Sequence, residues 1–147
     1  MASTAATIAS VPGETDASDV SLVRLHVLRA IYALLAVGIG AMILPPLVSH
    51  APDARGVIPS LIGAVGLLAL IGLRHPLRML PLLMFEFAWK TLWLLVFGLP
   101  QYASSHMPAT FAEDFFNIAF GVVLMPIVIP WGHVWRRYVK APAERWR

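Results

Sequence analysis

Cysteine is absent from the 147-residue sequence, and charged residues are scarce. The absence of cysteine excludes disulfides, thiolate metal sites, cysteine nucleophiles and thiol redox chemistry. Asp, Glu, Lys and Arg make up 13% of the chain, against about 25% in soluble domains, whereas 59% of the residues are hydrophobic. The mean hydropathy is +0.75. This composition indicates a membrane protein of one domain.

Four segments have the length and composition of membrane spans: residues 30–48, 57–73, 79–99 and 111–131. A helix crosses the hydrocarbon core of a bilayer with about 20 apolar residues. None of the segments alternates between polar and apolar residues, so helices are expected rather than strands. The sequence therefore predicts an all-α integral membrane four-helix bundle over residues 19–140, between a disordered tail at 1–18 and a basic tail at 141–147.

The basic residues are distributed unevenly around the predicted spans. Nine of the eleven lie on one side: Arg24, Arg29, Arg74, Arg78, Arg136, Arg137, Lys140, Arg145 and Arg147. Only Arg55 lies on the other side, and Lys90 is within a span. The positive-inside rule places the basic side, and with it both termini, in the cytoplasm. Because the basic residues follow membrane topology, the net charge of +3 does not indicate a nucleic-acid partner.

Local signals predict how the first and fourth helices begin or end. Pro45 and Pro46 are expected to stop the first helix. Thr110 and Glu113 have the spacing of a capping box, which predicts a side-chain cap at the start of the fourth helix. Pro126 removes a backbone hydrogen bond and predicts a bend near the end of that helix.

Glycines in the first two spans predict close helix packing. Gly38 and Gly40 lie in the first span, and Gly63, Gly66 and Gly72 lie in the second. Small residues let helix backbones approach in lipid, where no hydrophobic force draws helices together. The pattern is typical of contact between the two helices within one chain. A seam between two copies of the chain, or a pathway lined by backbone, is the alternative.

Glu86 and Lys90 are ionisable residues inside the third predicted span. Each costs about 2.5–3.5 kcal/mol to insert at the centre of a helix, so the pair needs a structural or functional reason. The i, i+4 spacing with the acid first favours an ion pair. Asp114 and Asn117 share one face of the fourth helix with Gly121. We therefore expect an intramembrane polar site consisting of Glu86, Lys90, Thr91, Asp114 and Asn117.

The polar site has two interpretations. An acid and an amine in a medium of low dielectric constant can relay protons or hold a charged head group. Alternatively, the two charges neutralise one another and only fix the register of the helices.

No other chemistry is indicated. The five histidines lie at helix ends or in loops without a metal-binding spacing, and no nucleophile elbow, phosphate-binding loop or zinc-protease motif occurs. Neither a cofactor nor a metal nor a catalytic residue is expected.

Two stretches, residues 75–100 (HPLRMLPLLMFEFAWKTLWLLVFGLP) and 121–147 (GVVLMPIVIPWGHVWRRYVKAPAERWR), resemble a group of small bacterial inner-membrane proteins with four predicted spans. The resemblance covers about the second half of the chain and implies a bacterial plasma membrane, without an activity. In number and size of spans the chain also resembles DoxX-like proteins and small multidrug transporters. The transporters carry an essential Glu in the first span, and that span has no acid here, so their mechanism is not carried over.

Three functions are compatible with these observations. The first is a non-enzymatic accessory or scaffold protein, with the bilayer and either a second copy or another membrane protein as partners. The second is a small proton- or cation-coupled transporter that uses Glu86 and Lys90. The third is a membrane enzyme acting on a lipid or a quinone.

Overall fold

The computed structural model describes residues 20–49, 56–104 and 108–141 of the 147. The tail predicted at 1–18, Arg55, and most of the basic tail lie outside the described residues. The described elements are all helical: α2 (Leu22–Ser49), α3 (Val57–Arg74), α4 (Leu80–Trp93), η2 (Leu94–Gly98), α5 (Leu99–Ala103), α6 (Ala109–Val128), α7 (Trp131–Val134) and η3 (Trp135–Val139).

Four of the described helices are long and apolar enough to cross a membrane: Leu22–Pro45, Val57–Arg74, Leu80–Ala103 and Thr110–Val128. The predicted all-α, four-span fold class is confirmed. The first helix begins at Leu22, whereas the predicted span begins at residue 30. Arg24 and Arg29 interrupt the apolar pattern, but arginine is a good helix former and does not interrupt the helix.

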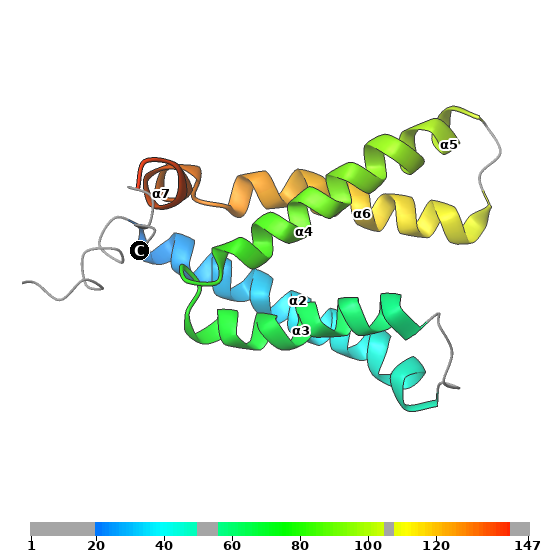
Figure 1. Cartoon of the computed structure of the whole chain (residues 1–147), viewed down its shortest axis with the longest axis horizontal. Coiled ribbons are helices and arrows are strands. Elements are labelled where there is room, and N and C mark those ends of the chain that lie inside the picture. Colours follow the sequence, from blue (N-terminus) through cyan, green and yellow to red (C-terminus); the bar gives the residue numbers. More distant parts are fainter. Residues whose placement is uncertain (1–19, 50–55, 105–107, 142–147) are drawn as a thin grey trace, which may run out of the picture.

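The helices form two hairpins (Figure 1). In one hairpin α2 packs along α3, and in the other the continuous helix α4–η2–α5 packs along α6. The hairpins approach each other at the end that carries the α3–α4 connection and α7, and they diverge toward the end that carries α5 (Figure 1). We call these the closed end and the open end.

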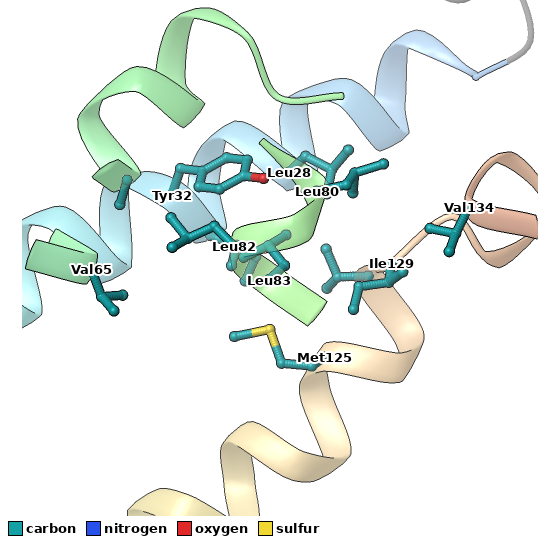
Figure 2. Close-up of a cluster of buried hydrophobic side chains, with 12 residues drawn as sticks. Leu28, Tyr32, Val65, Leu80, Leu82, Leu83, Met125, Ile129 and Val134 are labelled. Carbon is teal, nitrogen blue, oxygen red and sulfur yellow. The ribbon is translucent and has the colours of Figure 1, made fainter. Parts of the chain in front are cut away.

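The buried core lies at the closed end. Its largest fully buried apolar side chains come from two helices and the residue that follows α6: Tyr32 and Leu28 of α2, Leu80 and Leu83 of α4, and Ile129 (Figure 2). Large apolar side chains elsewhere point outward, as Leu67, Phe97 and Val123 do. In a helix that crosses a bilayer such side chains meet lipid, so the buried cluster is what joins the two hairpins.

Glycines of α3 receive large side chains of α2. A Cβ atom at Gly66 would lie 3.0 Å from Cγ2 of Ile39, and one at Gly72 would lie 2.6 Å from two ring carbons of Tyr32. A Cβ atom at Gly38 or Gly40 would meet no described atom within 4 Å. The two helices therefore interlock by placing large residues of α2 against glycines of α3, and the α2 glycines take no part in this contact.

Prolines shape the second hairpin. The Leu99 N–H donates to the Leu94 carbonyl, five residues back, so the turn before Pro100 is a wider π-helical turn. A regular α-helical turn would bring the proline ring against the carbonyl four residues earlier, and widening the turn relieves that clash.

Both ends of α6 differ from a regular helix. The capping-box prediction is wrong: α6 begins at Ala109, its N-cap is Pro108, and no side chain caps it. At the other end α6 includes Pro126 and the backbone is extended at Ile129, where the helix ends.

The first helix, α2, continues through Pro45 and Pro46 and ends at Ser49, although its apolar span ends at Pro45.

Candidate functional site

Glu86 and Lys90 form an ion pair on α4, with Lys90 Nζ donating to Glu86 Oε2. The pair forms locally, because residues four apart lie on the same face of a helix and the longer lysine side chain leans back toward the N-terminus. Glu86 is 2% exposed, whereas the Lys90 side chain keeps 15% of its surface exposed. The carboxylate is therefore the buried partner.

Trp89 completes the environment of the carboxylate. Its Nε1–H donates to Glu86 Oε1 at 2.9 Å, so each carboxylate oxygen has a donor on the same helix. The Lys90 ammonium also lies 4.4 Å from the centre of the Trp89 ring, within the range of a cation–π interaction. Sequence analysis did not assign Trp89 to the site. Its i+3 spacing from Glu86 and the N–H of its indole were the available signal.

Helix α6 approaches the site at Gly121. A Cβ atom at this position would lie 2.9 Å from Cδ and 3.1 Å from Cε of Lys90. The absence of a side chain at Gly121 thus leaves room for the aliphatic part of Lys90 between the two helices.

The other predicted members of the site lie elsewhere. The Thr91 hydroxyl donates to the Phe87 carbonyl of its own helix at 2.7 Å. Asp114 and Asn117 are both exposed on α6. Of the predicted residues, the structure thus brings together Glu86 and Lys90, with Gly121 facing them.

The polar atoms of the site have hydrogen-bond partners within the protein. Among the described residues, no buried side-chain nitrogen or oxygen is without a hydrogen-bond partner. No three His, Asp or Glu side chains in the described part of the chain lie close enough to share a metal ion. The arrangement can hold one negative and one positive charge next to each other inside an apolar helix pair.

A second buried polar contact lies at the closed end. The Tyr32 hydroxyl donates to the Pro76 carbonyl, in the α3–α4 connection, at 3.1 Å. Arg24 Nη2 also donates to the Ile129 carbonyl at 3.4 Å, at the end of α6. No sequence spacing links these partners, so sequence analysis missed both contacts.

Four apolar helices of membrane-spanning length, with a charged pair inside the third, define a small multi-span membrane protein. Comparison with known protein families, with curated proteins and with solved structures gives no match. Function is therefore inferred from the residues of this chain.

Proposed function

We propose that the chain is a non-enzymatic accessory or scaffold protein of a bacterial inner membrane, in which the Glu86–Lys90 pair fixes the position of α4. The observation that carries the proposal is that both oxygens of the buried carboxylate accept hydrogen bonds from the same helix. Intramembrane acids that relay protons or bind substrate commonly face a water-filled cavity. Here both oxygens of the carboxylate are paired within α4, by Trp89 and Lys90.

The divergence of the hairpins supports a role in binding other membrane helices. Apolar faces of the helices remain uncovered by the chain itself, and a Cβ atom at Gly38 or Gly40 would meet no described atom within 4 Å. Small residues on an uncovered face allow a second helix to approach closely. The partner in this proposal is a second copy of the chain or another membrane protein.

The proposed orientation places the closed end in the cytoplasm, on the strength of the basic residues. A reporter fused after Arg147 is expected to be active only in the cytoplasm, and one inserted within residues 104–108 only outside it. The reverse pattern would overturn the orientation.

Removal of both charges tests the scaffold proposal. The double variant Glu86→Leu, Lys90→Leu replaces the pair with apolar side chains, which often leaves stability unchanged or higher. We expect this variant to fold, as judged by helical circular dichroism and a single elution peak. We also expect it to complement deletion of the gene. A variant that folds like wild type but does not complement would overturn the proposal.

Transport coupled to protons or cations is the second candidate, and the position of Lys90 favours it. Its side chain keeps 15% of its surface exposed and carries the charge next to the buried carboxylate. Proteoliposomes containing wild-type protein would then pass protons or cations faster than empty liposomes, and the double variant would not. Under the scaffold proposal, all three preparations leak equally. No group of described residues supports the third hypothesis, an enzyme acting on a lipid or quinone.

A further inference from the structure

The C-terminal helical segment α7–η3, residues 131–139, lies across the direction of the spans. The backbone is extended at Ile129 and α7 begins after Pro130, so the chain changes direction where α6 ends. In Figure 1 α7 is seen nearly along its axis, whereas α6 runs across the page. The apolar span of α6 ends at Val128, only a few residues before α7. In a bilayer crossed by the spans, α7–η3 therefore lies along the membrane surface at the closed end.

Contacts with the spans hold this segment against the end of the bundle. The Trp131 Nε1–H donates to the carbonyl of Pro126, in the last turn of α6, at 2.8 Å. The ring of Trp131 also meets the ring of Phe87 on α4 edge to face, with the centroids 6.1 Å apart. Val134 is buried in the core of the closed end. The position of the segment relative to α4 and α6 is thus fixed by packing.

One side of the segment is an exposed apolar row of Trp131, Trp135 and Val139. These residues follow one another at intervals of four, which places them on the same side of a helix. Because the Trp131 ring reaches back to Pro126 in the span, this side faces the bilayer rather than the water. Tryptophan is enriched at the level where a membrane meets water.

Basic residues lie beside the apolar row. Arg137 and Lys140 are exposed, and neither has an ion pair or hydrogen bond with another described residue. The sequence contains no acid between Asp114, near the far end of α6, and Glu144. The buried Glu86 of α4 is already paired with Lys90. Within the described part of the chain, no acid therefore compensates the positive charge of α7–η3.

We propose that α7–η3 is an interfacial helix that binds the head groups of anionic phospholipids, with its apolar row inserted among the acyl chains. A helix with aromatic residues on one side and basic residues beside them is typical of binding in the interface plane. Basic residues at a membrane surface attract anionic lipids, and the inserted tryptophans select a lipid over a soluble anion. This binding does not depend on the proposed scaffold function, because it uses neither Glu86 nor Lys90.

The absence of cysteine allows a single reporter to be placed on the segment. In the variant Val139→Cys the new thiol is the sole one in the chain and is labelled with bimane, a dye that nitroxides quench at short range. The full chain is placed in phosphatidylcholine vesicles with a small, equal fraction of phosphatidylglycerol or phosphatidylcholine that carries a nitroxide next to the head group. We expect the phosphatidylglycerol nitroxide to quench about twofold or more strongly, and the excess to fall as salt is added. Equal quenching by the two lipids at low salt would overturn the proposal.

A second label position tests whether the enrichment is local to α7–η3. Phe116→Cys places the dye at an exposed position of α6, close in sequence to the exposed acids Glu113 and Asp114. There the phosphatidylglycerol nitroxide should quench no more strongly than the phosphatidylcholine nitroxide, since the acids repel an anionic head group. The same excess at both label positions would contradict a site on α7–η3.

Charge variants in the Val139→Cys background identify the residues that attract the lipid. Arg137→Gln with Lys140→Gln should remove most of the excess quenching. Arg29→Gln with Arg78→Gln removes the same net charge from exposed positions on α2 and in the α3–α4 connection, and it should leave most of the excess. Arg137→Lys with Lys140→Arg keeps both charges and should keep the excess. Equal losses in the two Gln pairs would assign the attraction to the whole closed end and overturn the proposal.

The depth of the label tests the insertion of the apolar row. Phosphatidylcholine with a nitroxide next to the head group should quench the labelled Val139→Cys variant more strongly than phosphatidylcholine with a nitroxide at the end of the acyl chain. Circular dichroism checks that the labelled chain keeps its helices. A dye that neither lipid quenches would show that the row projects into water. A dye quenched more strongly from the chain end would show that the segment does not lie at the interface.

Discussion

Glu86 and Tyr32 are both buried polar residues, but they find their hydrogen-bond partners in different ways. The Glu86 carboxylate is bound by Trp89 and Lys90, three and four residues along the same helix. The Tyr32 hydroxyl donates to the carbonyl of Pro76, which is 44 residues away and outside α2. One polar group is thus satisfied by a single helix, and the other only when two helices and a connection have come together.

Glu86 and Tyr32 thus show two separate ways in which a buried polar group obtains its hydrogen-bond partners. A polar group inside a bilayer must be paired, because no water is available to it. The Glu86 pair is complete as soon as α4 forms, so it brings the charge into the membrane without depending on the rest of the fold. The Tyr32 contact is complete only in the assembled closed end, so it contributes to the specific arrangement of α2, α3 and the α3–α4 connection.

The largest effect is expected from breaking the local pair on one side only. Lys90→Leu leaves the Glu86 carboxylate buried with Trp89 as its remaining donor on α4. Removing one member of a buried ion pair costs about 3–5 kcal/mol of unfolding free energy. Unfolding in mixed micelles of a mild detergent and dodecyl sulfate, followed by circular dichroism, measures this loss.

The double variant Glu86→Leu, Lys90→Leu is the matched control, since it differs from Lys90→Leu only at position 86. It is expected to recover wild-type stability, because apolar replacement of a buried pair is often neutral or stabilising. A Lys90→Leu variant as stable as wild type would show that no ion pair stabilises Glu86, and the contrast with Tyr32 would disappear.

An effect nearly as large is expected where Tyr32 packs against α3. A leucine at Gly72 would place its Cβ within 2.6 Å of the tyrosine ring and force α2 and α3 apart. Overpacking of this kind costs about 1–3 kcal/mol, and we expect the upper end because the ring is fully buried.

Gly38→Leu is the control for that change, because a Cβ there meets no described atom within 4 Å. Its unfolding free energy in the same micelles should stay within about 0.5 kcal/mol of wild type. Equal losses in the two variants would mean that the Gly72–Tyr32 contact does not hold the hairpin together.

The same contrast explains what could be predicted from the sequence. The spacing of Glu86 and Lys90 is a property of one helix, so it predicted the ion pair, just as runs of apolar residues predicted the four spans. Tyr32, Gly72 and Pro76 belong to different elements, and nothing in their spacing indicates that they meet. The glycines of the first two spans predicted close packing of α2 and α3, but the α2 glycines were expected to share in it, whereas large residues of α2 lie against Gly66 and Gly72.

Helix α6 also shows that residue spacing within one helix does not predict contacts between helices. Asp114, Asn117 and Gly121 share a face by periodicity, yet only Gly121 meets Lys90, while the two polar residues are exposed. Periodicity gives the direction of a side chain around its own helix. It does not tell which face of the helix meets its neighbour, and at the end of α6 that carries Asp114 the contacts are made by Phe111 with Trp93 and by Phe115 with Tyr102.

The smallest effect is expected from Tyr32→Phe, which keeps the packed ring and removes only the hydroxyl. Hydrogen bonds measured inside membrane proteins average about 0.6 kcal/mol, so the variant should lose about that much unfolding free energy in mixed micelles. Gly72→Leu, which displaces the same ring, should lose several times more. This ratio would show that the ring, rather than the hydrogen bond to Pro76, holds the closed end. A loss in Tyr32→Phe as large as that in Gly72→Leu would reverse that assignment and make the long-range hydrogen bond the main contribution.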